Sequence, residues 1–360
     1  MQDFSHSTRI LSGSNAVSFL KTLNIQRLFL VTDPYFTKNG MADLVCKAAN
    51  APHIEIFDQI QPDPSVALAA EGTARVKAFQ PDVILALGGG SAIDCAKAMA
   101  YFSGSCAKLI AIPTTSGSGS EVTDFSILTH DGVKHPLVDS RLRPSVAILD
   151  DAFLLQLPPS LVADTGFDLI CHALEAYVAT NASPITDALA KEAFCTAFAS
   201  LPASFAGQTE VRLKIHTAAT MAGLAFSQAG LGLCHALAHS LGGMFHIPHG
   251  RLNAILLPAV IHCNNHTAGH KYANLARAAG LGGSADTLAL RNLRNGLIRL
   301  RNELKLPGDL RQAGVDPRQV WHAMDSLVAS TLADPCCSTN PIPVADFMVR
   351  QVLEEVMGRG

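Results

Sequence analysis

The sequence predicts an α/β half built on a parallel sheet, followed by an all-helical half. A chain of 360 residues is long enough for about two domains of ~100 to 200 residues each. In the first 150 residues, short apolar runs rich in β-branched residues alternate with helical stretches. After Pro158 the β signal fades, and Ala- and Leu-rich segments repeat with helical period.

Five apolar runs in the first half predict strands. The runs are largely continuous rather than alternating, which is typical of parallel strands that are buried on both faces. We therefore expect βαβ units with helices on both sides of the sheet. The predicted strands are residues 27–31, 54–57, 83–87, 109–112 and 146–149.

The boundary between the halves is predicted between residues 155 and 160. There Leu157-Pro158-Pro159-Ser160 combines a turn with a helix N-cap. Beyond it, residues 183–206 and 213–225 show helical period. We assign residues 1–156 to the α/β domain and residues 157–360 to the helical domain.

The composition is that of a folded globular protein and argues against several classes. Hydrophobic residues make up 48% and charged residues 16%, so the chain has the apolar surface that disordered chains lack. The net charge is −3 without a long Lys or Arg run, which argues against nucleic acid as a partner. Neither a signal-peptide pattern nor a run of ~20 apolar residues occurs, so we expect no membrane partner. The nine cysteines contain no CxxC pair, which favours a cytoplasmic protein.

A glycine-rich turn follows the third predicted strand. The strand leads into Gly88-Gly89-Gly90-Ser91, and residues 92–101 then show a helical pattern. Glycines let a backbone approach a pyrophosphate, and the start of a helix attracts the anion, so we expect a dinucleotide phosphate here. The alternative is a tight turn without a ligand. A second loop, PTTSGSGSE at residues 113–121, offers hydroxyl groups for ribose or phosphate.

Asp33, directly after the first predicted strand, indicates which dinucleotide is bound. A carboxylate at the C-terminal end of a strand accepts hydrogen bonds from a ribose diol and repels a 2′-phosphate, which favours NAD(H) over NADP(H). The alternative is that Asp33-Pro34 only begins a turn.

Six of the 14 histidines lie between residues 235 and 266, and this clustering suggests a metal site. His235 and His239 are four residues apart, as are Asp168 and His172, so each pair lies on one face of a helix. His249 follows nearby. Imidazole and carboxylate together suit Fe²⁺, Zn²⁺, Co²⁺ or Mn²⁺. Either pair alone is also explained by solvation or packing, and spacing leaves open which four of the five side chains bind.

Other aromatic and imidazole side chains have weaker context. Phe226, which precedes His235, is interpreted either as an apolar wall of the substrate site or as a core aromatic residue. We expect His246 and His262 to be structural or surface residues, and His216 and His322 belong to no motif.

Four motifs together resemble the iron-containing (group III) alcohol dehydrogenase family. They occur in the family's order, and the resemblance covers almost the whole chain. They are GGGSAID at 88–94, PTTSGSGSE at 113–121, DLICHALEA at 168–176, and GLGLCHALAH at 230–239 with PHG at 248–250. Residues 226–233 and Thr339-Asn340-Pro341 resemble the branch of 1-propanol and ethanol dehydrogenases of bacterial propanediol, ethanolamine or choline breakdown.

The resemblance implies roles for individual residues. It makes Asp168, His172, His235 and His249 the metal ligands, with Fe²⁺ as the metal and Zn²⁺ as the alternative. It places His239 beside the metal as the catalytic residue, near the nicotinamide and the substrate. Contacts with NAD(H) are implied at Asp33, Gly89, Gly90, Ser91, Asp94, Thr114, Thr115, Ser118 and Lys134. Cys95 and Cys171 stand where many relatives have other small residues, and their thiols suggest oxygen sensitivity.

These expectations describe a metal-dependent, NAD(H)-linked alcohol dehydrogenase. One carboxylate and three neutral imidazoles leave a divalent ion with a net charge of about +1, so the ion stays a good Lewis acid. His239 can relay a proton because imidazole titrates near neutrality. Alcohol oxidation by NAD⁺ is generally uphill at neutral pH, so we expect physiological reduction of a short-chain aldehyde, of the propionaldehyde or acetaldehyde type, to the primary alcohol.

The assembly and its location are further expectations. We expect a homodimer or larger homo-oligomer in the cytoplasm, with association with bacterial microcompartment enzymes left open. Residues 14–24 are predicted to form a first helix rather than an encapsulation tag.

Three alternative functions remain open. The nearest is a glycerol-dehydrogenase-like polyol oxidase. A dehydroquinate-synthase-like lyase needs several Lys and Arg for a substrate with phosphate and carboxylate groups, but the motif stretches around 168–175 and 226–250 have only Arg251. A metal- and nucleotide-binding protein without turnover is expected to lose some of the five candidate metal-site side chains, all of which are present.

Overall fold

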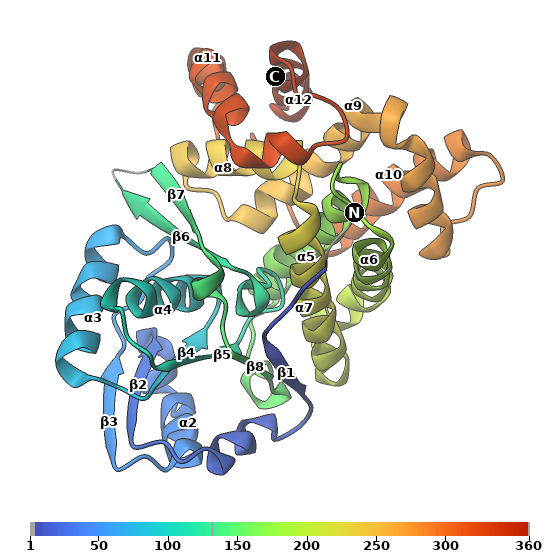
Figure 1. The fold of residues 1–360 in the computed structure, drawn as a ribbon. Coiled ribbons are helices and arrows are strands. Elements are labelled where there is room, and N and C mark those ends of the chain that lie inside the picture. The colour runs from blue at the N-terminus through green and yellow to red at the C-terminus, as the bar shows by residue number, and fades with distance from the viewer. Residues whose placement is uncertain (1–3, 131–132, 359–360) are drawn as a thin grey trace. The chain divides into compact units, whose positions relative to one another are not determined.

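The structure, a computed structural model, describes residues 4–130 and 133–358 (Figure 1). The chain forms two compact units. The first contains Ser5–Leu157 together with Arg212–Gly223, and the second contains Pro158–Val211 and the chain from Leu224 onward.

A six-stranded parallel sheet forms the framework of the first unit. The strand order is β1-β8-β5-β4-β2-β3, and every neighbouring pair is parallel. All five predicted strands are confirmed to within one residue at each end, as β2, β3, β4, β5 and β8. The strands are β1 (Arg9–Ser12), β2 (Arg27–Thr32), β3 (His53–Phe57), β4 (Val83–Gly88), β5 (Lys108–Pro113) and β8 (Val146–Leu149).

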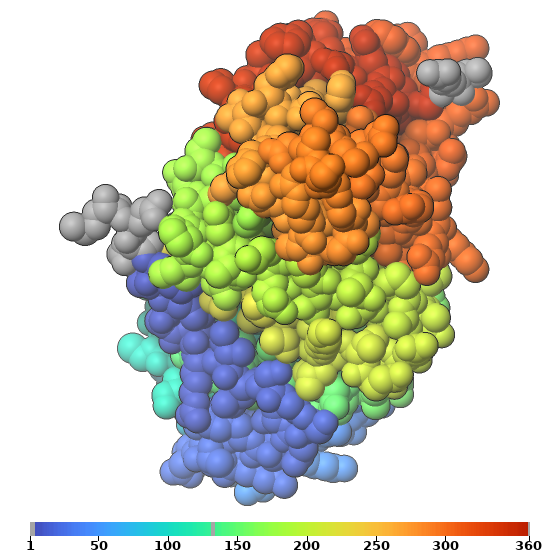
Figure 2. Space-filling view, turned by 90° about the vertical axis from the view of Figure 1, so that its right-hand side faces the viewer, coloured from blue at the N-terminus to red at the C-terminus, as the bar shows by residue number. Residues whose placement is uncertain are grey.

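Three strands were not predicted. β1 lies at the edge of the sheet beside β8, and three of its four residues are exposed, so it lacks the apolar run that marks a buried strand. The N-terminal segment that contains it lies at the surface, in dark blue in Figure 2. β6 (Phe125–His130) and β7 (Val133–Val138) form a separate antiparallel pair.

Helices cover both faces of the sheet, as expected. Leu28 and Leu30 point into a core with η1 and α2, whereas Phe29, Val31 and Ile84 point into a second core with α3 and α4. Both sets of side chains are buried, which explains the continuous apolar runs, and each fully buried side chain of this size stabilises the fold by about 1.5–3 kcal/mol. The helices are η1 (Ala16–Thr22), within the predicted 14–24, α1 (Pro34–Lys38), α2 (Met41–Ala49), α3 (Val66–Phe79) and α4 (Gly90–Ser103).

The second unit is helical. The two predicted helical segments are confirmed as α6 (Pro184–Phe205) and α7 (Arg212–Ala229), although the first part of α7 groups with the first unit. Ser183 caps α6, because its hydroxyl accepts the N–H of Thr186. The other helices are α5 (Pro159–Val178), α8 (Leu233–Phe245), α9 (His249–Ala278), α10 (Asp286–Glu303), α11 (Pro317–Ala333), η6 (Pro335–Thr339) and α12 (Asp346–Val356).

Within the described residues, we find no single helix with the length and apolar character needed to cross a membrane. The helical stretches Thr209–Ala229 and Leu233–Phe245, bent by 103° at their junction, meet that criterion only as a pair and only by length and composition.

Candidate functional site

The sheet of the first unit has a topological switch point between β2 and β4. From β2 the chain continues to β3 on one side, whereas from β4 it continues to β5 on the other. Open α/β sheets bind ligands outside the carboxyl ends of such strands, because the loops there diverge. Thr32 pairs with Leu87, so Asp33, which follows β2, and Gly88, which ends β4, lie beside each other where the two loops diverge.

The glycine turn packs closely against the second predicted loop. A Cβ atom on Gly88 would lie 2.6 Å from a Cβ atom of α4, so a side chain does not fit there. Cβ atoms on Gly89 and Gly90 would lie 3.2 Å from the hydroxyl of Thr115 and 3.1 Å from that of Ser118. α4 begins at Gly90 and has no side-chain cap, which leaves its N-terminus suited to an anion.

Asp33 has two separate surroundings. Its Oδ1 accepts the N–H of Tyr35 at 2.9 Å and caps the short helix α1, as the turn interpretation requires. Its Oδ2 lies 3.9 Å from the position of a Cβ on Gly88, next to the glycine turn. Partial burial raises the pKa of this carboxyl.

Three more residues that were predicted to contact the dinucleotide are Thr114, Ser91 and Lys134. Thr114, just after β5, is buried, and its N–H donates to the carbonyl of Gly88 at 3.0 Å. Ser91 is half-buried in the first turn of α4. Lys134, on β7, pairs with Asp63 at 2.8 Å. Their contacts with a dinucleotide stay predictions.

Asp94 is already bonded to the protein through both carboxylate oxygens. The hydroxyl of Ser120 donates to Oδ1, and the N–H of Ile127 donates to Oδ2 at 3.0 Å. Nζ of Lys97 lies 3.9 Å from Oδ1. The side chain therefore anchors the loop before β6, and its direct contact with a dinucleotide stays a prediction.

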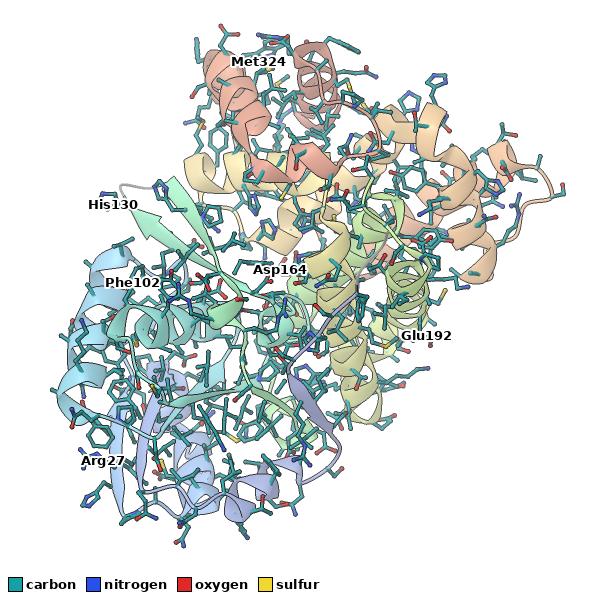
Figure 3. The ribbon with its side chains drawn as sticks, in the orientation of Figure 1. Arg27, Phe102, His130, Asp164, Glu192 and Met324 are labelled. Atoms are coloured by element: carbon teal, nitrogen blue, oxygen red, sulfur yellow. The ribbon has the colours of Figure 1, made fainter. Side chains whose placement is uncertain are left out.

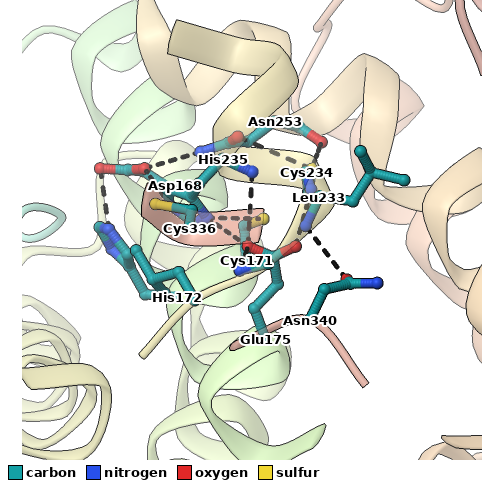
Figure 4. A network of polar contacts seen from close by, with 12 residues as sticks. Asp168, Cys171, His172, Glu175, Leu233, Cys234, His235, Asn253, Cys336 and Asn340 are labelled. Atoms are coloured by element: carbon teal, nitrogen blue, oxygen red, sulfur yellow. Dashed lines mark hydrogen bonds and ion pairs between the residues drawn. The ribbon is translucent and has the colours of Figure 1, made fainter. Parts of the chain in front are cut away.

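The second unit brings the five candidate metal-site side chains together. The oxygens of Asp168 lie 3.9 Å from Nδ1 of His172, 3.8 Å from Nε2 of His235 and 3.7 Å from Nε2 of His249. Figure 4 shows Asp168 and His172 on α5 beside His235 on α8. Ligands ~2.0–2.2 Å from one ion lie ~3–4 Å from one another, which matches this spacing. His239 stacks on His249, with ring centroids 5.1 Å apart.

The cluster contains a buried nitrogen without a hydrogen-bond partner. His235 is 1% exposed, and its Nε2 is unpartnered, the nearest oxygen of Asp168 being 3.8 Å away. A buried polar atom without a partner costs stability, and a metal ion would satisfy it. The donor set of one carboxylate and three imidazoles suits Fe²⁺ or Zn²⁺.

The charges of the cluster also favour a cation. Burial by itself lowers the pKa of His235, but the carboxylates of Asp168 and Glu175 outweigh burial and raise that pKa to about 10. Burial likewise opposes ionisation of Asp168, but His172 and the other imidazoles hold its pKa well below the usual range. The two carboxylates thus stabilise a positive charge between them.

Glu175 supports the cluster from the next turn of α5. Its Oε2 lies 2.6 Å from Nδ1 of His235 and accepts the N–H of Gly232 at 3.0 Å, while its Oε1 accepts the N–H of Cys234 at 2.7 Å. It therefore caps α8, whose own N-cap, Gly232, offers no side chain. Glu175 belongs to the motif DLICHALEA at 168–176, but no role was predicted for it. Its position three residues after His172 was the available signal.

Asp334 is a second residue of the site that was not predicted from the sequence. Its Oδ2 lies 2.8 Å from Nδ1 of His239, and its other oxygen accepts the N–H of Cys336 at 2.8 Å. Asp334 directly precedes η6 and is 95 residues from His239, so local spacing could not predict the contact.

An aromatic stack orients His172. Its ring lies between those of Phe226 and His235, with centroid distances of 4.4 and 4.5 Å. Phe226 is 4% exposed, which agrees with the interpretation as a core aromatic residue.

The start of α9, which carries His249, is held close to α5. A Cβ on Gly250 would lie 1.8 Å from the carbonyl oxygen of Asp164, so the two helices meet where only glycine fits. Arg251 also forms an ion pair of 2.9 Å with Asp164, which Figure 3 labels. Asn253 donates to Oδ1 of Asp168 at 2.8 Å.

The remaining histidines lie elsewhere. His246 ends α8 in a left-handed conformation (φ 55°), and His262 is exposed, as expected for structural or surface residues. His322, which belongs to no motif, is also exposed. His216 is buried in the first unit, where a hydrogen bond of 3.0 Å joins its Nδ1 to Oγ of Ser116.

Two models of known protein families match most of the chain. The model of the iron-containing alcohol dehydrogenases matches residues 7–151, and the model of the C-terminal part of the Fe-containing alcohol dehydrogenase family matches residues 162–357. The chain belongs to the iron-containing alcohol dehydrogenase family. As a member of that family it is an alcohol dehydrogenase, and its parallel sheet followed by a helical region is the family's fold.

Individual relatives of this iron-containing alcohol dehydrogenase match along their whole length. It is 40% identical to the 1-propanol dehydrogenase PduQ of Citrobacter freundii, over 99% of this chain and 100% of that protein. It is 35% identical to the NADPH-dependent butanol dehydrogenase of Clostridium saccharobutylicum, over 98% and 97%. The solved structure of sulfoacetaldehyde reductase from Bifidobacterium kashiwanohense with NAD⁺ has a TM-score of 0.88 and 25% identity, over 99% and 98%.

Proposed function

We propose that this alcohol dehydrogenase is metal-dependent and NAD(H)-linked, and that it reduces a short-chain aldehyde to the primary alcohol. The buried cluster around Asp168, with the unpartnered Nε2 of His235, is the observation that carries the proposal. Asp168, His172, His235 and His249 would hold the metal, Fe²⁺ with Zn²⁺ as the alternative. Such an ion, when bound, supplies Lewis-acid polarisation of the substrate oxygen during hydride transfer at the nicotinamide.

His239 is the residue that we assign to proton transfer. Its Nδ1 lies 2.8 Å from the carboxylate of Asp334, so Asp334 orients the ring and leaves Nε2 to exchange a proton with the substrate oxygen or water. The stacking of His239 on His249 supports a place beside the metal ligands.

The switch point of the sheet supports the site for NAD(H). The turn at Gly89 and Gly90 and the hydroxyls of Thr115 and Ser118 would contact the phosphates and ribose. Asp33 would accept hydrogen bonds from the ribose diol and disfavour a 2′-phosphate. The name of the NADPH-dependent relative indicates that the family also contains enzymes with the other preference, so Asp33 carries this part of the proposal.

A small substrate without charge fits the pairing of Arg251 near the cluster. Arg251, the cation that the motif stretches supply, is paired with Asp164 at 2.9 Å and is not available for an anionic substrate. A dehydroquinate-like substrate would need several such cations. The name of the 1-propanol dehydrogenase relative supports propionaldehyde as the first substrate to test.

We further propose a cytoplasmic homo-oligomer, with association with microcompartment enzymes as the alternative to a free enzyme. The resemblance to the dehydrogenases of bacterial propanediol, ethanolamine or choline breakdown supports the alternative of microcompartment association. Native mass measurement tests the oligomer, and sedimentation of the enzyme with shell proteins tests the association.

One experiment tests the catalytic proposal. The protein is purified without oxygen, its metal content is measured, and the absorbance of NADH is followed with propionaldehyde, acetaldehyde and a panel of diols. We expect NADH consumption with the short aldehydes, its loss after treatment with a chelator, and its return with Fe²⁺ or Zn²⁺. Full turnover of chelator-treated protein that contains no metal would overturn metal dependence. Preference for diols with NAD⁺ would favour the polyol oxidase.

A further inference from the structure

The loop between β5 and β6, which contains most of PTTSGSGSE, is held on one side by hydrogen bonds to residues of α4. Ser120 donates to the carboxylate of Asp94, and Nζ of Lys97 donates to Oγ1 of Thr123 at 2.9 Å and to the carbonyl of Phe125 at 2.8 Å. Lys97 is fully buried, so both of its hydrogen bonds lie away from water. These contacts restrain the C-terminal part of the loop.

The first part of α7 holds the same loop at three more points. A hydrogen bond of 3.0 Å joins Nδ1 of His216 to Oγ of Ser116, and the hydroxyl of Thr220 donates to Oε1 of Glu121 at 2.6 Å. Gly223 is the third point. Its Cβ, if present, would lie 2.9 Å from the carbonyl oxygen of Gly119, in the middle of the loop.

The spacing of these three helix residues makes them one surface. His216, Thr220 and Gly223 are separated by four and three residues, so they lie along one face of α7. That part of α7 belongs to the first unit, although the sequence places it among the helices of the second half. Along the chain, the second unit resumes at Leu224, directly after the part of α7 that contacts the loop.

The contacts are buried, which makes them specific. Ser116, Glu121, Thr220 and His216 are each no more than 8% exposed. Burial raises the pKa of Glu121, and the hydrogen bond from Thr220 opposes that rise by stabilising the charged carboxylate.

Close packing at the third point requires glycine on both sides. Gly119 has φ +62°, and a Cβ on it would lie 2.7 Å from Cα of Gly223. A side chain at either position would push the loop away from α7. The loop is thus held between two helices, with its hydroxyls Thr115 and Ser118 beside the glycine turn.

We propose that His216, Thr220 and Gly223 are positioning residues that set the conformation of the loop and, through it, the affinity for NAD(H). The proposal rests on the proposed function, because it takes Thr115 and Ser118 as contacts of the dinucleotide. The five candidate metal-site side chains all belong to the other unit. We therefore expect substitutions of these residues to change the affinity for NADH without changing the metal content.

The test compares two Thr→Val changes on the same helix. Thr220→Val removes the donor to Glu121, whereas Thr217→Val removes a hydroxyl that bonds Leu213 and Ser12 instead of the loop. The dissociation constant of NADH is measured by its fluorescence on metal-loaded protein, with metal content and thermal midpoint recorded for each variant. We expect Thr220→Val to raise the dissociation constant ~10-fold, which corresponds to about 1.4 kcal/mol.

A second pair of variants tests His216. His216→Leu removes the bond to Ser116, whereas His216→Asn keeps a polar atom near the position of Nδ1. We expect His216→Leu to raise KM for NADH with little change in kcat, and His216→Asn and Thr220→Ser to stay within about twofold of the unchanged protein. A purely structural role would lower the thermal midpoint and leave the dissociation constant of NADH unchanged.

The outcomes separate this inference from the proposed function. If the unchanged protein binds no NADH, the proposed function fails. If the unchanged protein binds NADH and Thr220→Val and His216→Leu bind it equally well, the inference fails and the proposed function stands. An effect of Thr217→Val equal to that of Thr220→Val would also overturn the inference.

Discussion

Oε2 of Glu175 lies 2.6 Å from Nδ1 of His235, the shortest contact that either side chain makes in the candidate metal cluster (Figure 4). The carboxylate accepts a hydrogen bond from Nδ1–H, so Nε2 is the nitrogen that can bind a metal. The same carboxylate accepts the N–H groups that begin α8. One residue therefore orients both a proposed ligand and the helix that carries it.

Replacing Glu175 is expected to weaken metal binding. In Glu175→Gln, one carboxylate oxygen becomes an amide nitrogen that cannot accept the N–H groups of α8 or the proton of His235. Loss of a carboxylate behind a metal-binding imidazole typically costs ~10–100-fold in metal affinity. A competition titration with a chelating dye measures the change. Glu192→Gln on α6, where the side chain is exposed, is the control, and equal metal affinity of both variants would contradict the role of Glu175.

Replacing Asp334 is expected to slow turnover and leave metal content unchanged. Asp334→Asn removes the charge that orients His239, and a hydrogen bond to a charged group is worth ~1.5–3 kcal/mol, or ~10–100-fold in kcat. Steady-state kinetics with propionaldehyde and NADH measure the loss. Asp325→Asn, which removes an exposed carboxylate paired with Arg350, provides the matched control. A kcat equal to that of the control would show that Asp334 does not act through His239.

The charge of Asp33 is expected to decide the choice of dinucleotide. Asp33→Asn keeps a side chain that can cap α1 but removes the charge that repels a 2′-phosphate. The ratio of kcat/KM for NADH to that for NADPH should fall ~10-fold, the equivalent of about 1.4 kcal/mol. Asp33→Gly, which also loses the cap, should shift the ratio in the same direction. An unchanged ratio in both variants would leave Asp33 with the capping role alone.

Burial of His216 predicts a loss of stability in mild acid. Burial lowers the pKa of His216 from 6.5 to about 4. Between these values the unfolded chain binds a proton that the folded protein does not, so the free energy of unfolding falls as the pH falls through this window. The contribution from this residue is about 2 kcal/mol between pH 7 and pH 5.

Urea unfolding at the two pH values measures this slope. In His216→Asn, the free energy of unfolding should lose the part of its pH dependence that His216 contributes. In His322→Asn, a change at an exposed position, that pH dependence should be retained. The same slope in both variants would assign the acid sensitivity to other groups.

Local patterns accounted for much of the architecture. Four of the five predicted strands, β2, β4, β5 and β8, are buried along nearly their whole length, and burial on both faces requires apolar residues at every position. The fifth, β3, lies at the edge of the sheet and is mostly exposed or half-buried. β1 was not predicted because its residues are mostly exposed at an edge of the sheet. The pair β6 and β7 was not predicted for a related reason, because β6 is only partly buried and β7 includes Pro136.

The candidate metal side chains could also be proposed from spacing, because a separation of four residues on a helix is a local property. The partners of these side chains could not. Asp334 reaches His239 across 95 residues, and Glu175 reaches His235 across 60. Such contacts depend on how the helices pack, which no periodicity encodes.

The order of residues along the chain was enough to determine the alternation of strand and helix, the glycine turn after β4, and two helical pairs of potential ligands, because each depends on neighbours within one or two turns. Only the folded chain decided that Asp168 lies within 4 Å of three imidazoles, and that His216, Thr220 and Gly223 face the loop before β6. The physical reason is that burial selects one face of a helix, but the surface that buries it is supplied by residues ~100 positions away.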